Sequence, residues 1–400
     1  MIVRDHYINQ IRPFYESDLI KVITGIRRCG KSVILSQISE ELKSEGKSVL
    51  VINFEHIEYS TQIHDAVSLT EFVKSRIPKG KKLYVFLDEV QLIDGWNIAC
   101  RSLRLENISL FITGSNSRLL SKEFTKELSG RYVSFCIRPF VYKEISEYSK
   151  ELGREYPISS YLTYGGFPKV IEMRDEESTI LYLNDLNQTI VVNDILNRYS
   201  IQKTDLFKRL VNYVLVSNAR IFSANSITNY IKSERLTCSI NTVMKYLSYL
   251  EEAYVIRKVA QYSTRCKRAL SSYAKIYDED VSFNTIRQQK GKFDLTHNLE
   301  NIVYNELIYM GYEIQVFNKN NREIDFLARK GGKEYLIQVA YSVAEENTYK
   351  REMALFNVLD QSRKKILITT DAVDFSTSTV QHISFQDFLK LESLDSTVTL

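Results

Sequence analysis

The chain has 400 residues and a formal net charge of +4 at neutral pH, with 44% hydrophobic and 26% charged residues. This length allows two to four domains, and the composition is that of an ordinary soluble globular protein. We expect neither a transmembrane helix nor a signal peptide, because no long apolar run is present and the first residues are charged. Five widely spaced cysteines without a CxxC pair argue against a disulfide scaffold or a zinc cluster and favour a cytoplasmic protein.

The first motif along the chain is GIRRCGKS, which fits the Gly-x-x-x-x-Gly-Lys-Ser pattern of a phosphate-binding loop. An apolar, β-branched run at 19–24 predicts a buried strand before it, and apolar residues spaced from Ile34 to Leu42 predict a helix after it. Strand, glycine loop and helix N-terminus bring backbone amides and a partial positive charge to an anion. We therefore expect ATP to be bound by Gly25, Ile26, Arg27, Arg28, Cys29, Gly30, Lys31, Ser32 and Val33.

Hydrolysis also needs a metal ligand and a base. The apolar run 83–87 predicts a buried parallel strand that ends in Asp88 and Glu89, at the edge where α/β sheets bind ligands. We expect Lys31 to reach the β- and γ-phosphates, Ser32 and Asp88 to hold Mg²⁺, and Glu89 to act as general base on the attacking water. An acidic strand end is a weak signal alone. Its position after the phosphate loop, with one predicted strand between them, strengthens the prediction.

Two further residues are candidates for catalysis. The predicted strand 108–113 leads into Gly-Ser-Asn, where Asn116 or Ser115 would sense the γ-phosphate or orient the water; an ordinary turn is the alternative. Arg131 opens a fifth predicted strand and is placed to neutralise transition-state charge, in cis or as an arginine finger from a neighbouring subunit. A surface or structural arginine is the alternative there. The inter-subunit version predicts a homo-oligomer.

The stretches VITGIRRCGKS, YVFLDEVQ, FITGSNSRLL, LSGRYVSFCIRPF and YLTYGGFPKV resemble the prokaryotic AAA-family ATPases that carry a C-terminal domain of unknown function, the AAA_14/DUF4143 type. The resemblance covers nearly the whole chain. It implies an AAA-type P-loop fold, ATP and Mg²⁺ as cofactors, and ATP, metal and hydrolysis roles for Lys31, Ser32, Asp88 and Glu89. The Gly-Gly-Phe-Pro turn at 165–168 matches a family motif whose role the resemblance does not define.

The fold expected for the whole chain is α/β, with four domains. A P-loop AAA-type ATPase domain with a parallel sheet is expected at 1–150, and a helical lid or connector at 151–203. A winged helix-turn-helix domain is expected at 204–280, and an α/β restriction-endonuclease-like domain at 281–400.

The predicted winged helix consists of three amphipathic helices followed by a strand pair. Its third helix would present residues suited to base edges and phosphates, and the basic loop after it would grip the DNA backbone. Residues 201–275 hold 13 basic and 4 acidic side chains, a net charge of +9, which is typical of a nucleic-acid contact. A domain that only packs or binds protein is the alternative. The candidate DNA-binding residues are Asn241, Thr242, Lys245, Arg265, Lys267 and Arg268.

The C-terminal domain resembles the restriction-endonuclease core, with Glu306 on a predicted helix and Asp325 on a predicted strand. In that fold the next strand carries Glu-x-Lys, whose glutamate helps to hold Mg²⁺ and whose lysine activates water. Here the two positions are Gln338 and Ala340, which lack the required charge and donor. We therefore expect a degenerate PD-(D/E)xK nuclease-like domain, unless a lysine from elsewhere, such as Lys350, replaces the missing one.

The leading functional hypothesis is an Mg²⁺-dependent ATPase that couples its nucleotide state to DNA. The alternative is a nucleotide-dependent switch that acts on protein partners without DNA. An ATP-regulated nuclease is the third hypothesis, and the two missing nuclease residues oppose it.

Overall fold

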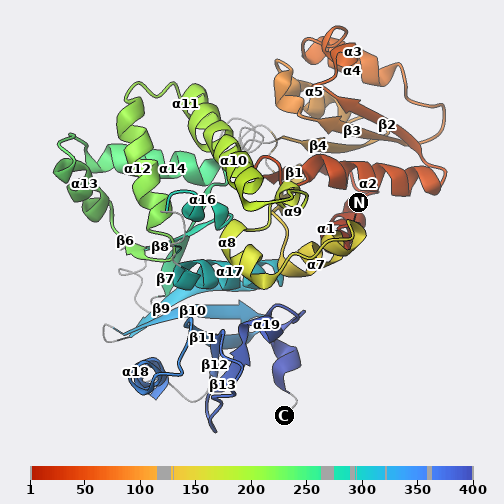
Figure 1. The fold of residues 1–400 in the computed structure, drawn as a ribbon. Helices are drawn as coiled ribbons and strands as arrows, with labels where there is room; N and C mark the ends of the chain where they lie inside the picture. The colour runs from red at the N-terminus through yellow and green to blue at the C-terminus, as the bar shows by residue number, and fades with distance from the viewer. Residues whose placement is uncertain are drawn as a thin grey trace. The chain divides into compact units, whose positions relative to one another are not determined.

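The computed structural model describes residues 2–114, 128, 130–262, 274–288, 293, 295–319, 322–357 and 363–398 (Figure 1). The chain divides into two compact units. The first consists of Met1–Pro139 with Glu252–Tyr254, and the second of Phe140–Glu251 with Val255–Leu400. The first border thus falls before the expected boundary at 150, and the three later segments belong to the second unit apart from Glu252–Tyr254.

The first unit is a five-stranded, wholly parallel sheet in the order β2-β3-β4-β1-β5, as expected for an α/β nucleotide-binding domain. Its strands are β1 (Ile20–Gly25), β2 (Ser48–Asn53), β3 (Leu83–Asp88), β4 (Ile108–Thr113) and β5 (Tyr132–Ile137). Its helices are α1 (Asp5–Ile11), α2 (Lys31–Ser44), α3 (Ile57–Ser60), α4 (Ala66–Lys74) and α5 (Trp96–Leu103), with 3-10 turns at Arg12–Phe14 and Val90–Leu92.

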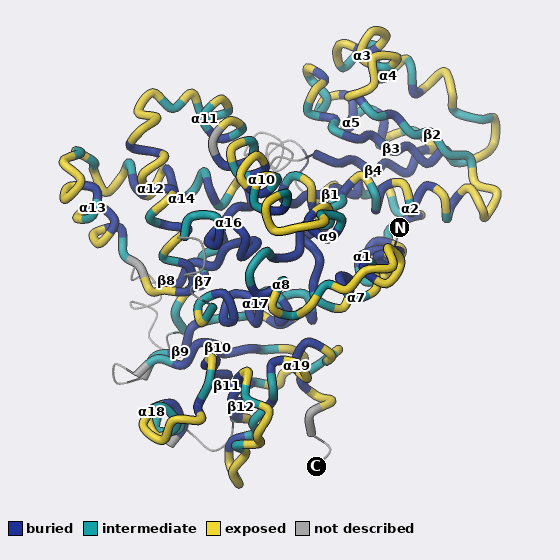
Figure 2. Tube along the Cα trace, viewed as in Figure 1, coloured by how far each residue is buried: buried dark blue, intermediate teal, exposed yellow. Residues whose placement is uncertain are grey.

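Helices cover both faces of this sheet, which explains why its central strands read as continuous apolar runs. Every residue of β1, β3 and β4 is buried (Figure 2). One face packs against α4 and α5 through residues such as Leu69, Val73 and Leu103. The helix α2 contributes Ile34 and Ile38, both fully buried, to the core beside β1. This packing fixes the strand ends that carry the predicted site.

The second unit begins with helices: α7 (Tyr142–Glu151), α8 (Ile158–Tyr164), α9 (Pro168–Ile171), α10 (Glu176–Asn187), a π-helical segment (Gln188–Asp194) and α11 (Ile195–Arg198). The segment expected at 204–280 follows as α12 (Thr204–Val216), β6 (Ile221–Phe222), α13 (Ala224–Ser233), α14 (Ile240–Glu252), β7 (Ile256–Tyr262) and β8 (Ala274–Asp278). The last part comprises α16 (Ser282–Thr285), α17 (Leu295–Tyr309), β9 (Glu313–Lys319), β10 (Arg322–Lys330), β11 (Lys333–Val339), α18 (Glu346–Asn357), β12 (Lys364–Thr369), β13 (Gln381–Ser384), α19 (Phe385–Phe388) and a 3-10 turn (Leu394–Val398).

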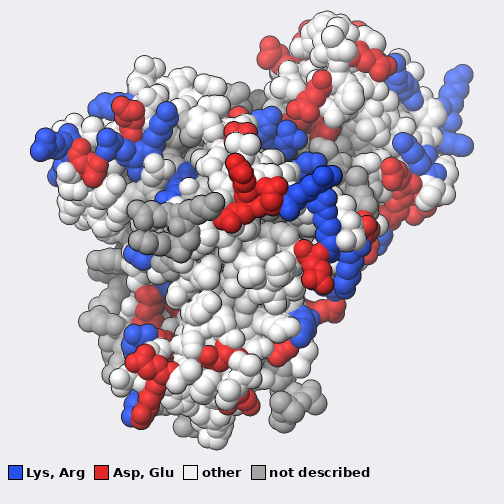
Figure 3. Space-filling model, viewed as in Figure 1, with Lys and Arg blue, Asp and Glu red and all other residues white. Residues whose placement is uncertain are grey.

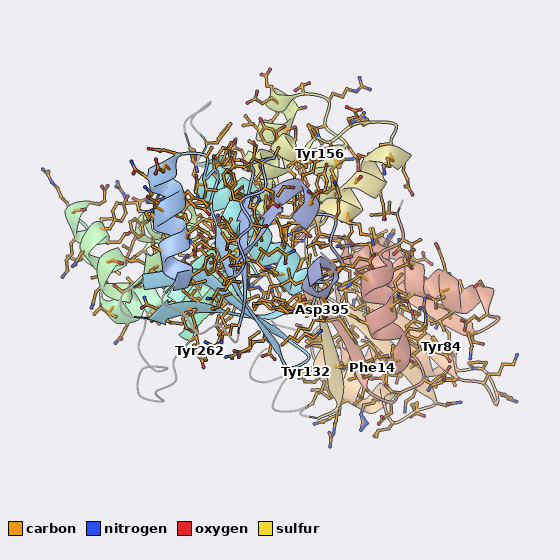
Figure 4. All side chains as sticks on the ribbon, turned by 90° about the horizontal axis from the view of Figure 1, so that it is seen from below. Phe14, Tyr84, Tyr132, Tyr156, Tyr262 and Asp395 are labelled. Atoms are coloured by element: carbon orange, nitrogen blue, oxygen red, sulfur yellow. The ribbon has the colours of Figure 1, made fainter. Side chains whose placement is uncertain are left out.

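One eight-stranded sheet runs through this unit in the order β13-β12-β11-β10-β9-β7-β8-β6. Its two halves join where β7 and β9 pair in parallel, with Gln261 opposite Val316 and Tyr262 opposite Phe317. The ring of Tyr262, labelled in Figure 4, stacks on that of Phe317 at 5.6 Å. Because β7 pairs with β9, the segments predicted as the third and fourth domains contribute strands to one sheet.

The Gly-Gly-Phe-Pro turn has a packing role in the second unit. A Cβ atom on Gly165 would lie 1.9 Å from Oδ1 of Asp280, and a Cβ atom on Gly166 would lie 2.0 Å from the carbonyl oxygen of Phe140. The amide of Gly166 donates to the buried Asp280 carboxylate at 2.7 Å. The two glycines therefore allow a close backbone approach that no side chain would permit.

Within the described residues, no helix combines the length and the apolar character needed to cross a membrane.

Candidate nucleotide-binding site

The predicted phosphate loop connects the end of β1 to the start of α2. Gly25 has φ +137°, and a Cβ atom there would lie 2.0 Å from the carbonyl oxygen of Ile137, so only glycine fits. Arg28 and Gly30 also have positive φ, +69° and +98°. Left-handed residues inside a short loop curl the backbone so that successive amides converge, which is the geometry that binds anions.

The helix α2 begins at Lys31, and no side chain caps the N-terminus at Gly30. The first-turn amides of a helix have no partner within the helix, and its N-terminus carries a partial positive charge. The buried ammonium of Lys31 donates to the carbonyls of Gly25 at 3.2 Å and Ile26 at 3.0 Å, which holds it across the mouth of the loop. Ser32 is exposed in the first turn. The predicted loop residues therefore form one continuous curve whose geometry suits an anion.

The two predicted acids lie at the end of β3, in the same sheet as β1. Asp88 is the last residue of β3 and is buried, while Glu89 follows it with a left-handed backbone, φ 54° and ψ 43°. A non-glycine residue in that region carries conformational strain, and such residues cluster at functional sites. The strand β4 lies between β3 and β1 in the sheet, so its end separates the acids from the phosphate loop.

Three polar residues form hydrogen bonds with these acids, and none of the three was predicted from the sequence. The hydroxyl of Thr113, the last residue of β4, bonds Asp88 Oδ1 and accepts the amide of Glu89 at 3.2 Å. Asn53, the last residue of β2, donates to Asp88 Oδ2 at 3.2 Å. The side-chain amide of Gln91 donates to the Glu89 carboxylate. Both oxygens of Asp88 are therefore oriented by groups at the ends of neighbouring strands.

The remaining catalytic candidates have different positions. Asn116 and its alternative Ser115 lie outside the described residues. Arg131 is exposed just before β5, and its carbonyl accepts the amide of Ile20 at the opposite end of β1 from the loop. Five register steps separate the Ile20–Tyr132 pair from the pair that contains Gly25, which corresponds to about 16 Å along the strands. Arg131 therefore lies at the far edge of its own sheet from the phosphate loop.

The candidate DNA-binding residues are placed only in part. Asn241 and Lys245 are exposed on α14. Thr242 is half-buried, and its hydroxyl lies 2.9 Å from that of Ser239, whose Oγ accepts the Thr242 amide at the start of the helix. Thr242 therefore takes part in capping α14, a role that competes with contact to a base edge. Arg265, Lys267 and Arg268 fall outside the described residues.

The predicted nuclease-like residues do not come together as expected. Glu306 is buried and accepts the amide of Tyr142 at 2.9 Å and the hydroxyl of Tyr161 at 3.1 Å, and burial raises its pKa to about 7. It therefore anchors the helices at the start of the second unit. Lys350 is exposed and pairs with Glu346, one turn away on α18. Neither residue contacts Asp325 in the structure.

A different lysine reaches Asp325. The buried Nζ of Lys275 on β8 lies 2.9 Å from Asp325, 2.8 Å from Glu300 on α17 and 2.7 Å from Glu323. Burial opposes its charge, but the three carboxylates together raise the pKa of Lys275 well above its ordinary value. Gln338 accepts the amide of Asp325 at 3.3 Å. In the described part of the chain no group of three or more His, Cys, Asp or Glu side chains is arranged to hold a metal ion.

Comparison with protein families matches residues 17–146 to an AAA domain and residues 157–288 to a domain of unknown function, DUF8612. The AAA match contains the phosphate loop, both acids, Thr113 and Arg131. The domain of unknown function contains the helices α8 to α14 and the strand pair β7–β8.

Two relatives match nearly the whole chain. An uncharacterized protein of Haemophilus influenzae is 36% identical over 380 residues, which cover 92% of this chain and 93% of the relative. An uncharacterized protein of Methanocaldococcus jannaschii is 30% identical and covers 88% of this chain and 82% of its own. Among solved structures, a Walker-type ATPase of Pyrococcus abyssi is 14% identical with a TM-score of 0.50, covering 72% of this chain and 96% of that one. This last likeness is one of fold.

Proposed function

We propose that this chain, which belongs to the same family as the two uncharacterized relatives from Haemophilus influenzae and Methanocaldococcus jannaschii and contains an AAA domain, is an ATPase whose nucleotide cycle is coupled to DNA binding. The observation that carries the ATPase part is the edge of the parallel sheet at which the phosphate loop, Asp88 and Glu89 meet. Nucleotide binding follows from the family and the loop. Hydrolysis and DNA coupling are the parts that need experiments.

The oxygen donors at this edge suit Mg²⁺, a hard cation that is usually held by one or two carboxylates, waters and phosphate oxygens. Asp88 and the Ser32 hydroxyl would hold it, and Asn53 and Thr113 orient the Asp88 carboxylate. Bound there, Mg²⁺ would neutralise charge on the phosphate oxygens. The loop amides and Lys31 would bind the β- and γ-phosphates and fix the reacting phosphoryl group.

Glu89 is the proposed general base for the attacking water. Its amide is tied to Thr113 and its carboxylate to Gln91, so its position is set from two sides. A base must be held at hydrogen-bond distance from the proton it takes, and these contacts restrict the rotation that would spoil that geometry. Glu89→Gln should therefore abolish turnover while leaving nucleotide binding intact.

The proposed DNA contact is the segment from α12 to β8, interpreted as a winged helix. The order of helix, short strand, two helices and strand pair supports this interpretation, as does the pairing of β6 with β8. Exposed Asn241 and Lys245 lie on α14, the proposed recognition helix. Figure 3 shows lysine and arginine side chains gathered over α12 and α13, with some acidic residues among them. Such a surface suits phosphate contacts.

We propose that Arg131 acts only on a nucleotide bound by a neighbouring subunit. An arginine at the far edge of its own sheet cannot reach a nucleotide held by its own loop, so an arginine-finger role requires a second copy of the chain. The proposal for Arg131 is therefore a trans role in a homo-oligomer.

A nuclease function finds little support in the C-terminal sheet. Lys275 engages Asp325, Glu300 and Glu323, and both Lys275 and Asp325 are buried, so a phosphodiester has no access to them. We propose that this part of the chain is a degenerate restriction-endonuclease-like domain, and we expect no DNA cleavage in Mg²⁺ or Mn²⁺.

The test is steady-state ATP turnover at low salt, with and without single- and double-stranded DNA, using Glu89→Gln as the inactive control. We expect turnover that DNA stimulates and that loses this stimulation as salt rises, because phosphate contacts are screened. Turnover that is indifferent to every nucleic acid would favour the protein-partner switch. Absence of turnover, with ATP still bound, would contradict the ATPase.

A further inference from the structure

The side chain of Arg4 is buried under the phosphate loop, although it precedes that loop by more than twenty residues. Only 2% of the residue is exposed. Its Nη1 donates to the carbonyl oxygen of Cys29 at 2.9 Å, and its Nη2 donates to that of Arg138 at 3.1 Å. The guanidinium also lies 4.6 Å from the centre of the Tyr7 ring. Burying a charge is costly, so a buried guanidinium on the loop needs a reason.

The segment that carries Arg4 is fixed to α2, the helix that the phosphate loop opens. The side-chain amide of Gln37 on α2 accepts the Arg4 amide at 3.2 Å and donates to the carbonyl of Ile2 at 2.6 Å. Arg12, eight residues further along, pairs with Glu41 on α2 at 2.7 Å, but this ion pair is solvent-exposed and adds little to the attachment. Gln37 therefore holds the backbone around Arg4 at a constant position relative to α2, and so to the end of the loop that α2 follows.

The bond from Arg4 to Cys29 acts on one particular peptide group. The carbonyl of Cys29 and the amide of Gly30 belong to the same planar trans peptide and point in opposite directions. A guanidinium that holds the carbonyl on one side therefore directs the Gly30 amide to the other side. Gly30 directly precedes Lys31, and a Cβ atom on Gly30 would come within 3.6 Å of Nη1 of Arg4.

We propose that Arg4 is a positioning residue for the phosphate chain of the nucleotide: by holding the Cys29 carbonyl it aims the Gly30 amide into the anion-binding curve. This inference rests on the proposed function and adds the N-terminal segment to the nucleotide site. A phosphate bound by this amide is bound in the ground state and in the transition state alike. Loss of the bond should therefore weaken nucleotide affinity and raise KM, with little change in kcat.

The test compares Arg4→Met and Arg4→Lys with Arg12→Met. Arg4→Met removes both bonds but keeps length, and Arg4→Lys keeps the charge but loses the planar fork that bonds two carbonyls at once. Arg12→Met loosens the same N-terminal segment without touching the loop. Equilibrium binding of a fluorescent ADP gives Kd, steady-state assays give KM and kcat, and thermal melting shows that each variant folds.

We expect Arg4→Met to weaken ADP binding and raise KM for ATP by at least about tenfold, the size of one missing hydrogen bond to a charged group, with kcat near that of the wild type. The ADP affinity and KM of Arg4→Lys should lie between those of Arg4→Met and the wild type, and those of Arg12→Met should match the wild type. If folded Arg4→Met binds ADP as tightly as the wild type, this inference is overturned while the proposed function stands. The same follows if Arg12→Met loses as much ADP affinity as Arg4→Met. A wild-type chain that binds no nucleotide would overturn the proposed function itself.

Discussion

At the residue scale, Thr113 is the group through which the two acids of the nucleotide site are held together. Its single hydroxyl bonds the Asp88 carboxylate and also accepts the Glu89 amide. One side chain thus sets the orientation of the proposed metal ligand and the backbone of the proposed base. Groups that orient a ligating carboxylate commonly matter almost as much as the ligand.

Thr113→Val removes this hydroxyl and keeps the shape of the side chain. We expect ATP turnover to fall by about 10–100-fold, because the carboxylate and the base lose a common anchor. Binding of ADP in the absence of Mg²⁺ should be unchanged, since the loop is not altered. Thr113→Ser restores the hydroxyl and should recover turnover, which separates the hydrogen bond from packing. Equal turnover in Thr113→Val and the wild type would contradict this role.

The positions of the loop and of both acids at strand ends could be predicted from sequence, because each follows a buried strand with a recognisable pattern. Thr113 was missed because the Gly-Ser-Asn after the strand offered more obvious polar candidates. The signal was present in the strand lengths: Leu87 pairs with Ile112, so the next residue of β4 is level with Asp88. Without known register, however, a threonine at a strand end resembles any β-branched residue.

At the element scale, the helix α17 shows why Glu306, the acid predicted to accompany Asp325, contacts other elements instead. Glu300 and Glu306 both lie on it, and six residues of an α-helix correspond to about one and two-thirds turns. Their side chains therefore leave the helix in different directions, Glu300 to Lys275 and Glu306 to Tyr161. Sequence spacing alone cannot decide which of two acids faces the sheet when both are buried.

Lys275 ties three elements together, since its carboxylate partners lie on α17 and β10 and it lies on β8 itself. Lys275→Met would leave these buried carboxylates without their cation. Breaking a buried ion pair in this way usually costs about 3–5 kcal/mol. We expect a loss of this size in urea unfolding at neutral pH. Lys258→Met is the control, since Lys258 on the neighbouring strand β7 pairs with Glu251 on α14, and this more exposed pair is worth about 0–1 kcal/mol.

The cost of Lys275→Met should depend on pH. Burial already raises the pKa of Glu300 to about 8, above its ordinary value of 4.5, and loss of the ammonium raises it further. A carboxyl whose pKa is higher in the folded chain takes up a proton on folding, so it destabilises more as pH rises above 4.5. Glu300 of the wild type ionises only as pH rises through about 8, and that of the variant at still higher pH, so the deficit relative to the wild type should be smaller at about pH 7 than at about pH 9. A deficit that is equal at both pH values would contradict the ionic account.

At the scale of the whole molecule, the charge of a segment is not the charge of a surface. The segment 201–275 has a net charge of +9, but the fold places several of its cations beside carboxylates. These pairs are Lys275 with its three acids, Arg257 with Glu279, Lys258 with Glu251 and Arg209 with Glu234. Sequence gives the number of charges, whereas pairing depends on contacts across the sheet. The exposed lysines and arginines of α13, α14 and the turn between them are Lys232, Arg235 and Lys245.

If these exposed cations contact DNA phosphates, reversing two of them should weaken DNA binding more than an equal change of charge elsewhere. We compare Lys232→Glu with Lys245→Glu, made together, against Lys79→Glu with Lys81→Glu, two exposed lysines of the first unit. The measurement is Kd for a labelled duplex as a function of salt. The first pair should reduce the slope of log Kd against log salt by about 0.9 for each phosphate that the protein no longer neutralises, and the control pair should leave it unchanged. An equal loss of DNA affinity in both double variants would show that net charge alone attracts the DNA. If the wild-type chain binds no duplex, the alternative function, contact with protein partners, is favoured for the second unit.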